Sequence, residues 1–524
     1  MKRIAKKILL ASVSIIILTL PTVSFAASNT DWTQSPKLYE VRTWTGKSEL
    51  GHGNGSLAEA TFFHPKSAVS LPDGRLLVSD SSNHFLRAVS IDKVSAYTGI
   101  DLGEDAETEL PLGGYNDDEL AKAAFDQPSG LAIDAQGNVF VADSNNHAIR
   151  KISKDGKVTT LAGNGNLGLT DGVGAKASFY NPSDVSVDSQ GNVYVADTLN
   201  NVIRKVTVDG TVTTLNAPST RIVEYFPGAV ETTGDFQDGP IASAKFNEPS
   251  GLALDSKGNL YVSDRGNQRI RYIDFAAGTV STVAGGGTYA KQAVYVAGDY
   301  VDGTSTDSRL NAPEGLTITA DGSLIIADSL NHAIRILKDG KVSTLAGIPT
   351  EFGKEDGVIG SAQFNHPTDV TVLADGRLVI VDEFGNKVRV LQKYAKPANL
   401  QTSVISVVYD GNLVPSDVPA QLKSNAVLLP LRSVGETLGY TVEFDKKTGN
   451  GKLIKGEAVY AIVKGSNKVV KTLKGKSETL SLNATAIVVN NRLFIPVRFF
   501  ASESNLDIQW DAAANVVVIR NKTF

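Results

Sequence analysis

The sequence predicts a mainly β protein in which a six-bladed β-propeller precedes a small duplicated α+β domain. Three observations lead to this prediction: a segment that recurs six times between residues 62 and 389, turn-forming glycines at fixed places in every copy, and an internal duplication after residue 402. The 48 glycines and the many short β-branched runs are typical of an all-β chain that is rich in turns.

Residues 1–26 have the features of a secretory signal peptide. Basic residues precede an apolar run of 13 residues, 8–20, and small residues lead to a cleavage position after Ala26. The run is shorter than the roughly 20 residues that span a bilayer. We therefore expect a secreted or cell-envelope protein without a permanent membrane span, with an uncleaved peptide as the alternative.

Composition and charge exclude several classes of function. The chain has no cysteine, which excludes disulfides, thiolate metal sites and cysteine nucleophiles. Residues 27–401 hold 32 Lys and Arg against 46 Asp and Glu, a balance of −14, whereas residues 402–524 hold 15 against 10, a balance of +5. An acidic large domain argues against a nucleic-acid partner.

The repeat is defined by an apolar anchor that a proline follows after three residues. The anchors are Phe62, Phe125, Phe179, Phe246, Leu310 and Phe364. An aspartate stands eighteen residues after each anchor, a glycine six residues before that aspartate, and an arginine seven residues after it. The aspartates are Asp80, Asp143, Asp197, Asp264, Asp328 and Asp382.

Each copy contains four short strands. In the second copy they are "LAID", "VFVAD", "AIRKI" and "VTTLAG", joined by the turns "AQGN" and "KDGK". Four antiparallel strands every 54 to 67 residues predict propeller blades. The pattern closely resembles the NHL repeat family, which shares the proline, the glycine turn, the "V-x-D-x-x-N" step and the following "I-R". The sixth copy departs from it, with Gly385 at the asparagine position.

The sixth copy lacks a fourth strand of its own. The segment 38–46, "LYEVRTWTG", is similar to the fourth strand of the other copies, and Gly55 precedes Phe62 as Gly172 precedes Phe179. We therefore expect the N-terminal strand to close the last blade, which removes exposed sheet edges. The predicted domains are the propeller at 27–392, a linker at 393–401 and the α+β domain at 402–524.

The six repeated aspartates are interpreted as structural. Six symmetry-related copies of one group do not converge on a single point, as a catalytic site requires. Side chains of Asp and Asn commonly bind loop backbone instead.

The "D-x-x-N" loops and the blade-to-blade connections should share one face of the propeller. The long connections 100–124, 217–245 and 286–309 supply aromatic and acidic residues to that face, suited to a sugar, a peptide or a cation. The alternative is a solvated acidic loop. The candidate binding residues are Tyr115, Asp117, Asp118, Tyr225, Phe226, Tyr289, Tyr295 and Tyr300.

Residues beside the repeated prolines should surround the mouth of the central channel. Asp184 and Asp369 lie on blades three apart, and Glu248 is a further neighbour of this ring. Such a mixture could hold a divalent metal and activate a water, although turn histidines and acidic rings are also ordinary features. The candidate metal ligands are His64, His366, Asp184, Asp369 and Glu314.

The C-terminal domain is built from two similar halves. Residues 425–445 align with 491–511 at an offset of 66, with Pro430 over Pro496 and Arg432 over Arg498. Each half predicts a strand, a helix from about Ser433 or Phe499, and a strand. The pattern is similar to the copper amine oxidase N-terminal-like, or stalk, domain. No histidine follows His366, so we do not expect copper or amine oxidase activity here.

We expect a secreted, monomeric, non-catalytic binding or scaffold protein of the bacterial cell envelope without a cofactor. Its ligand would be an extracellular protein, peptide or glycan on the decorated propeller face. The basic residues 402–524 would contact an anionic cell-wall polymer, with a neutral spacer as the alternative. A metal-dependent, lactonase-like lyase or hydrolase at the channel mouth is the alternative function.

Overall fold

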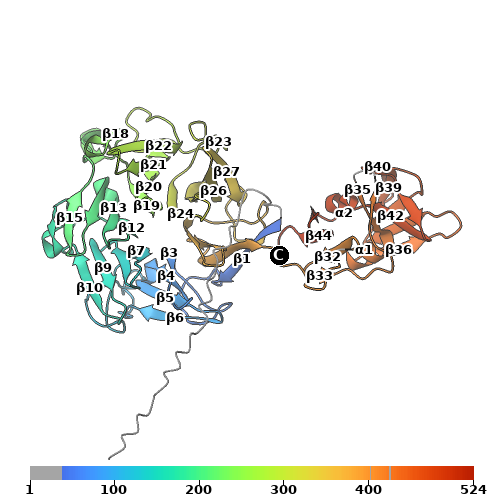
Figure 1. The fold of residues 1–524 in the computed structure, drawn as a ribbon, viewed down its shortest axis with the longest axis horizontal. Coiled ribbons are helices and arrows are strands. Elements are labelled where there is room, and N and C mark those ends of the chain that lie inside the picture. The colour runs from blue at the N-terminus through green and yellow to red at the C-terminus, as the bar shows by residue number, and fades with distance from the viewer. Residues whose placement is uncertain (1–37, 402, 424–425) are drawn as a thin grey trace, which may run out of the picture.

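The computed structural model describes residues 38–401, 403–423 and 426–524, so the predicted signal peptide at 1–26 lies outside the described residues. The described chain is mainly β, as predicted. Six sheets surround a central channel, and the C-terminal domain lies beside the last of them (Figure 1). No helix within the described ranges is long and apolar enough to cross a membrane.

Each blade runs from an outer strand to an inner strand that begins at the repeated proline. Blade one contains β2 (Gly55–Ser56), β6 (Lys93–Thr98), β5 (Phe85–Val89), β4 (Leu76–Asp80) and β3 (Pro65–Ser70). Blade two contains β10 (Val158–Ala162), β9 (Ala148–Ile152), β8 (Val139–Asp143) and β7 (Pro128–Ile133). Blade three contains β11 (Gly172–Val173), β15 (Thr211–Thr214), β14 (Val202–Val206), β13 (Val193–Asp197) and β12 (Pro182–Val187).

The remaining blades repeat this order. Blade four contains β18 (Gly239–Pro240), β22 (Thr279–Gly285), β21 (Arg269–Asp274), β20 (Leu260–Asp264) and β19 (Pro249–Leu254). Blade five contains β23 (Gly303–Thr304), β27 (Lys341–Ala346), β26 (Ala333–Lys338), β25 (Leu324–Asp328) and β24 (Pro313–Ile318). Blade six contains β28 (Gly357–Val358), β1 (Tyr39–Thr45), β31 (Lys387–Lys393), β30 (Leu378–Asp382) and β29 (Pro367–Val372).

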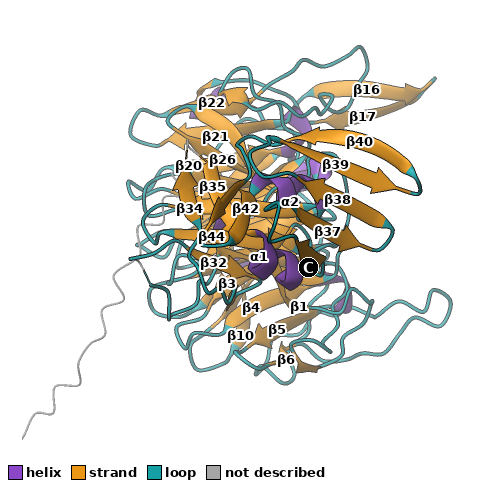
Figure 2. Ribbon diagram, turned by 90° about the vertical axis from the view of Figure 1, so that its right-hand side faces the viewer, coloured by secondary structure: helices purple, strands orange, loops and turns teal. Residues whose placement is uncertain are grey.

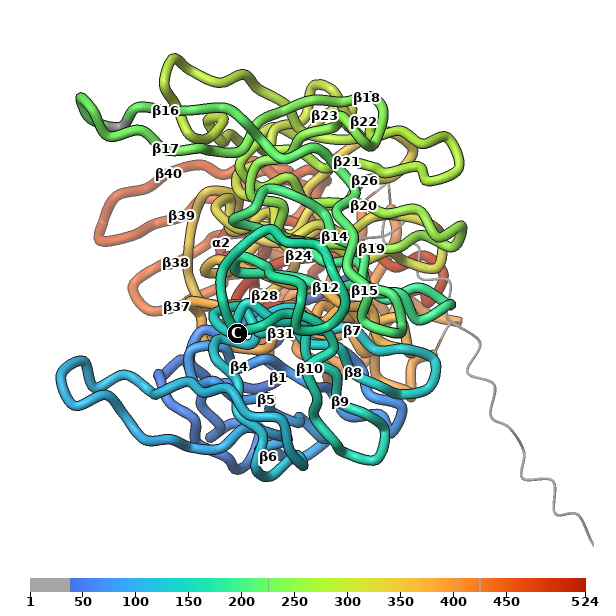
Figure 3. Tube along the Cα trace, turned by 90° about the vertical axis from the view of Figure 1, so that its left-hand side faces the viewer, coloured from blue at the N-terminus to red at the C-terminus, as the bar shows by residue number. Residues whose placement is uncertain are grey.

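The structure adds a short fifth strand that the repeat did not predict, at the outer edge of every blade except blade two. A hairpin of β16 (Arg221–Phe226) and β17 (Ala229–Thr233) also projects from the connection after blade three (Figures 2 and 3). Short 3₁₀ turns follow the repeated aspartates or the outer strands: η2 (Ser81–Asn83), η3 (Gly174–Lys176), η4 (Thr198–Asn200), η5 (Ile241–Ser243), η6 (Arg265–Asn267) and η7 (Ser329–Asn331).

The N-terminal strand closes the ring as predicted. β1 pairs antiparallel with β31 from Tyr39 opposite Lys393 to Thr45 opposite Val388. Thr43 donates its N–H and hydroxyl to the Asp356 carboxylate at 2.8 and 2.9 Å. Threonines on the fourth strands of blades two to five make the same pair of bonds to their own aspartates, so the N-terminal strand fills an equivalent place.

The propeller core consists of separate apolar layers between neighbouring blades. Each layer combines residues of two adjacent sheets, including the pair formed by blades six and one. The anchor of one blade packs against the preceding blade, as Phe125 packs with Leu77 and Leu86. All six anchors have no more than 1% of their surface exposed, so the repeated apolar residue is what joins consecutive blades.

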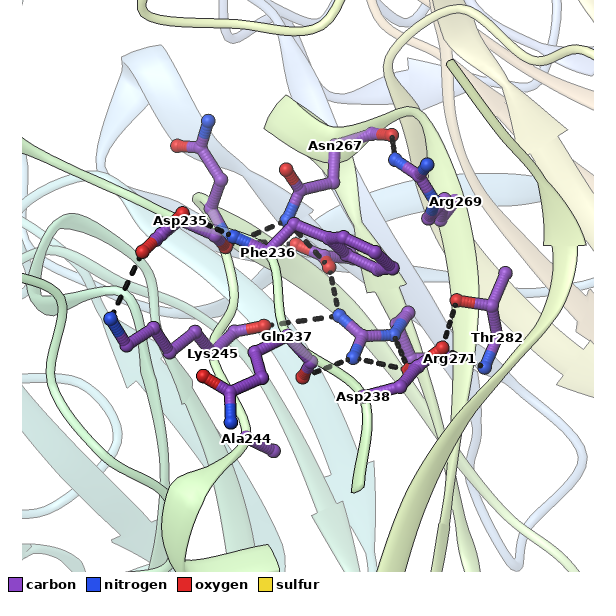
Figure 4. Close-up of polar contacts among 12 residues, drawn as sticks. Asp235, Phe236, Gln237, Asp238, Ala244, Lys245, Asn267, Arg269, Arg271 and Thr282 are labelled. Atoms are coloured by element: carbon purple, nitrogen blue, oxygen red, sulfur yellow. Dashed lines mark hydrogen bonds and ion pairs between the residues drawn. The ribbon is translucent and has the colours of Figure 1, made fainter. Parts of the chain in front are cut away.

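The repeated aspartate and arginine form a buried cluster in every blade. In blade four, Asp264 accepts bonds from the Asn247 backbone N–H at 2.8 Å, from Asn267 at 2.8 Å and from Arg271 at 2.6 Å. The same guanidinium reaches a second carboxylate, Asp238, at 2.6 Å, and Asp238 binds Thr282 (Figure 4). The structural interpretation of the repeated aspartates thus agrees with their contacts.

The second carboxylate of this cluster escaped the sequence analysis. It stands eight residues before the anchor and pairs with the arginine at 2.6 to 2.7 Å in blades two to six, where it is Asp117, Asp171, Asp238, Asp302 and Asp356. In blade one Asn54 takes its place and accepts from Arg87 at 2.9 Å. The sequence did carry a signal for this group, because a carboxylate or amide stands eight residues before every anchor.

Replacing Arg204 by Met should destabilise the propeller by about 3–5 kcal/mol, because the fully buried Asp197 would lose its countercharge. Asp171→Asn provides the comparison, since Asp171 is 47% exposed and an amide can still accept from Arg204; we expect a loss of about 1 kcal/mol or less. Urea denaturation of both variants measures the difference. Equal losses would contradict the central place of the buried pair.

A closed ring of hydrogen bonds also joins the blades at the decorated face. In each blade, one left-handed residue after the "D-x-x-N" step accepts the backbone N–H of the residue before the next blade's proline. The acceptors are Nδ1 of His84, His147 and His332, and the side-chain oxygens of Asn201, Gln268 and Asn386, at distances of 2.5 to 3.2 Å. A histidine can accept here only while Nδ1 is unprotonated.

We expect the double variant His147→Asn, His332→Asn to keep this ring and to lose part of the pH dependence of stability, because Asn201 and Asn386 already serve at the same position. Burial lowers the pKa of both histidines; the charge of His366 acts in the same direction at His332, whereas Asp126 opposes it at His147. The unfolded chain therefore binds protons at a higher pH than the folded chain. The stabilisation is present above about pH 6.5 and is lost as pH falls through the lower folded pKa values.

Thermal unfolding at about pH 7.5 and about pH 5 tests this expectation. The wild-type Tm should fall more on acidification than that of the double variant. His52→Asn is the control, because His52 makes no bond of this ring within the described chain. A wild-type profile that matches the double variant would contradict the assignment.

The C-terminal domain contains three sheets and two short helices around one core. The helices are α1 (Leu431–Thr437) and α2 (Arg498–Glu503), close to the predicted starts. The first sheet contains β33 (Asn412–Leu413), β32 (Ser406–Tyr409), β44 (Val516–Asn521) and β43 (Leu506–Asp511). The second contains β34 (Gln421–Lys423), β35 (Ala426–Pro430), β42 (Arg492–Pro496) and β41 (Ile487–Val489). The third contains β36 (Thr441–Phe444), β37 (Gly451–Lys455), β38 (Ala458–Ile462), β39 (Lys468–Leu473) and β40 (Lys476–Ser481).

The duplication is visible in the pairing of β35 with β42. Leu429 lies opposite Ile495, its equivalent in the second half, and the flanking pairs are symmetric about it. The two halves therefore meet at equivalent strands, which explains the recurrence of the strand and the helix that follows it.

The C-terminal domain contacts blade six directly. Val358 donates its N–H to Lys522 O at 3.0 Å, and the Phe524 ring lies 4.2 Å from the Arg42 guanidinium. The buried Arg520 donates to Tyr39 O at 3.3 Å. A side chain at Gly357 would collide with the backbone of Lys522, so this glycine permits the close approach of the two domains.

Candidate functional site

The mouth of the central channel holds a cavity of about 400 Å³. Its lining comes from the residues beside the repeated prolines and from those that follow the repeated aspartates, so every blade contributes. These residues belong to the face that carries the long connections, as the alternation of strands predicted. The cavity is bordered by hydroxyl, amide and charged groups.

Most blades place a hydroxyl at the two repeat positions that line the cavity. After the proline the residues are Ser129, Ser183, Ser250 and Thr368, and after the aspartate they are Ser81, Ser144, Thr198 and Ser329. Several hydroxyls donate to the backbone of the next blade, as Ser129 does to Ser183 O at 2.8 Å and Ser183 to Ser250 O at 2.9 Å. Their oxygens can still accept a bond from a ligand.

Four charged residues replace the hydroxyl at these positions. Lys66 and Glu314 stand after prolines, and Arg265 and Glu383 stand after aspartates. All four line the cavity, and they come from four consecutive blades of the closed ring: four, five, six and one. Departures from the repeat thus gather on one side of the channel mouth, opposite the hydroxyls of blades two and three.

The charged side forms a continuous chain of contacts. Lys66 lies 2.5 Å from Glu383, which lies 2.7 Å from His366 Nδ1. His366 Nε2 is 3.9 Å from Glu314, which lies 3.3 Å from Arg265.

The chain of contacts ends at the connection 286–309. Arg265 pairs with Glu248 at 2.9 Å, and the Tyr295 hydroxyl donates to Glu248 at 2.6 Å. Tyr295 is thereby connected to the charged side of the cavity.

These contacts favour the charged forms of Glu383 and Arg265 despite their burial. Burial raises the pKa of Glu383, but the hydrogen bond from His366 and the charge of Lys66 outweigh it and lower this pKa to about 2. Burial lowers the pKa of Arg265, while Glu314 and Glu248 raise it, with a net rise. The cavity therefore presents fixed charges of both signs beside neutral hydroxyls.

Two buried carboxyl groups line both this cavity and the adjoining space between the inner strands. Asp184 accepts the Leu252 N–H at 2.8 Å, and Asp369 accepts the Ala68 N–H at 2.9 Å and the Ser67 hydroxyl at 2.8 Å. Burial raises the pKa of Asp184 well above its usual value, and the charge of Asp369 adds to this. Burial likewise raises the pKa of Asp369 to about 6.

Four of the five predicted metal ligands line the cavity, whereas His64 is not among its lining residues, and all five bind protein groups. His366 and Glu314 belong to the charged chain, and Asp184 and Asp369 bind backbone amides. His64 Nδ1 lies 3.3 Å from the Ser82 hydroxyl, and burial lowers the pKa of its imidazole. Across the described residues, no three His, Asp or Glu side chains come together in an arrangement that could hold a metal ion.

Three predicted binding residues have structural contacts within the blades. Tyr115 and Tyr300 stack on the buried Arg150 and Arg335 at 4.8 and 4.7 Å, ten residues before their anchors. Asp117 is the second carboxylate of the cluster around Arg150, at 2.7 Å.

The other predicted binding residues are dispersed. Tyr289 lies against Arg221 at 3.9 Å, and burial raises its pKa to about 12. Asp118 binds the Glu119 N–H, and Phe226 is 74% exposed on the projecting hairpin. Tyr225 lies in β16, but its side chain is outside the described part of the structure. Tyr295 is thus the predicted aromatic that joins the cavity network.

The sequence analysis missed Lys66, Arg265 and Glu383. Their signal was present, because each carries a charge where most blades carry Ser or Thr. The residues that the copies share define the blades, whereas the charged groups of the cavity lie at positions where the copies differ.

Family comparisons agree with both predicted domains. Residues 125–152, 179–205 and 246–271 match the NHL repeat, and residues 408–519 match the copper amine oxidase N-terminal domain.

Curated proteins match more than half of the chain. The chain is 30% identical over 338 residues to Protein SUPPRESSOR OF QUENCHING 1, chloroplastic, of Arabidopsis thaliana, which covers 62% of this chain and 30% of that protein. It is 28% identical to NHL repeat-containing protein 2 of Bos taurus, over 61% of this chain and 45% of that protein. The chain thus spans less than half of the length of these two relatives.

Solved structures include similar propellers at low sequence identity. An auxiliary nutrient binding protein from Bacteroides thetaiotaomicron VPI-5482 is 16% identical, with a TM-score of 0.48 over 68% of this chain and 76% of that chain. A streptogramin B lyase is 11% identical, with a TM-score of 0.40 over 68% of this chain and 97% of that chain.

Proposed function

Because the chain is an NHL-repeat β-propeller that carries a C-terminal copper amine oxidase N-terminal domain, we propose that it is a non-catalytic binding protein of the cell envelope. Its ligand is a small polar molecule or chain end of about sugar size, held at the channel mouth. The predicted signal peptide supports export, and the C-terminal domain would position the propeller at the envelope.

One observation carries this proposal: the charged departures from the repeat converge on one cavity. A closed propeller needs neither Lys66 nor Arg265, Glu314 or Glu383 for its fold, since other blades use hydroxyls at the same positions. Different groups that meet at one point are what recognition of a ligand requires, whereas six equal groups are what a repeated fold requires.

The chemistry of the cavity favours a hydroxyl-rich ligand. A volume of about 400 Å³ falls within the usual range of small-molecule sites. Hydroxyl oxygens on blades two and three can accept from the ligand, and the opposite side offers carboxylates, a guanidinium and an ammonium. A sugar, with many donors and acceptors, matches this lining better than an apolar ligand does.

The metal-dependent lyase or hydrolase remains the less supported proposal. His366 and Glu314 are engaged with Glu383 and Arg265, and no metal-ligand cluster exists in the described chain. Nothing in the cavity distinguishes a nucleophile from the surrounding structural groups.

The test restores the repeat at the four charged positions. The variant Lys66→Ser, Arg265→Ser, Glu314→Ser, Glu383→Ser leaves the net charge unchanged and installs hydroxyls that other blades tolerate. We expect it to fold and to bind at least tenfold more weakly, or not at all, any sugar that the wild type binds. Saturation-transfer NMR against mono- and disaccharides, followed by calorimetry, measures this difference.

The matched control changes two exposed ion pairs on the opposite face: Asp73→Ser, Arg75→Ser, Asp375→Ser, Arg377→Ser. It removes two cations and two anions as well, and we expect wild-type binding. If a sugar binds the fourfold serine variant as tightly as it binds the wild type, its binding site does not include the four charged residues. If no sugar binds the wild type, the proposed ligand class is wrong.

A further inference from the structure

The C-terminal domain has a cavity of its own, of about 380 Å³. It lies between the start of α1, the strand β36 with the turn after it, and the beginning of β42. Its charged lining consists of Arg432, Lys446, Arg492 and Asp417.

Two of the three cations make no direct salt bridge within the described part of the domain. Neither Arg432 nor Lys446 makes a side-chain hydrogen bond or ion pair with any residue that the structure describes. Arg492 is held by Asp417, to which its Nε donates at 3.0 Å. The hydrogen bond with Arg492 lowers the pKa of Asp417, and the charge of Arg432 adds to this. The cavity therefore keeps an excess of two positive charges.

The internal duplication indicates that the fold does not require Arg492 or Lys446. At the offset of 66, Arg492 corresponds to Ala426 and Lys446 corresponds to Ala512. Arg432 does have an equivalent, Arg498, which lies outside the cavity lining. Two halves with the same strand and helix thus differ in charge at the cavity, as they would if one half had acquired a binding site.

The rest of the lining is mostly apolar, with Ser433 and Asn491 as its uncharged polar residues. Pro430, Val442, Phe444 and Leu493 border the same space. The cavity is larger than a single phosphate group. A charged group of the ligand would therefore enter together with the part of the ligand to which it is attached. An apolar wall beside cations suits the C–H face of a polyol or sugar that bears the charge.

We propose that this cavity binds a phosphate group carried on a polyol or sugar, as a repeating unit of a phosphodiester polymer. Arg432 and Lys446 meet the phosphate oxygens, Arg492 is pre-positioned by Asp417, and Phe444 contacts the carbon skeleton. The balance of +5 over residues 402–524 attracts the polymer, and the cavity supplies the selective contact.

The experiment uses the full chain and poly(glycerol phosphate) as the probe. We expect the double variant Arg432→Gln, Lys446→Gln to bind this polymer about tenfold more weakly than the wild type, because two charge-assisted contacts are lost. The matched control is Arg498→Gln, Lys447→Gln, which removes the same net charge from the equivalent arginine and the neighbouring lysine. It should bind within about twofold of the wild type. Calorimetry at fixed ionic strength measures all three.

Two further arms complete the test. Polygalacturonate, which carries carboxylates, should bind the wild type more weakly than poly(glycerol phosphate), and amide NMR shifts on adding glycerol 3-phosphate should centre on the cavity. Equal weakening in both double variants would mean that binding depends only on the overall positive charge of the domain, and it would contradict the proposed site. Equal affinity for the two polymers would overturn the phosphate assignment, and failure of the wild type to bind poly(glycerol phosphate) would overturn the proposal. Sugar binding at the propeller is independent of every outcome.

Discussion

The buried arginine of each blade is the interaction on which the propeller depends. Each arginine joins a fully buried aspartate at the end of the second strand to a carboxylate or amide that precedes the anchor, and it lies over an aromatic ring in all six blades. A buried guanidinium is costly unless its donors are satisfied. The residues around each arginine are therefore held in one arrangement. In blades two to six they include a threonine of the fourth strand, which binds the second carboxylate. The outer strands, the connection and the core are fixed together.

The positions that the fold leaves free to vary lie at the channel mouth. The arginine clusters lie inside the blades and the anchors lie between them, so most substitutions at these positions would destabilise the fold. The residues beside the prolines and after the aspartates face the channel, where most blades need only a small polar group. These positions are free to carry charge, and four of them do so on one side of the channel mouth. The residues that hold the blades together and the residues that line the cavity therefore occupy different positions of the repeat.

The C-terminal domain follows a parallel principle with two copies in place of six. Its halves meet symmetrically at β35 and β42, and their difference in charge marks one cavity. Direct contacts of Arg520, Lys522 and Phe524 with blade six join the two domains. These contacts connect the domain that carries the channel mouth with the domain that carries the basic cavity.

The sequence by itself determined the blades, the closure by residues 38–46 and the duplicated domain, because these depend on local periodicity and on residues at constant spacing. It also identified the channel-facing ring around His366 and Glu314. Only the tertiary structure decided that Lys66 meets Glu383, and that Tyr115, Asp117 and Tyr300 support buried arginines. Such contacts join residues that are distant along the chain, and whether a charged side chain turns toward a cavity or a buried partner depends on desolvation and geometry, which the spacing of residues does not contain.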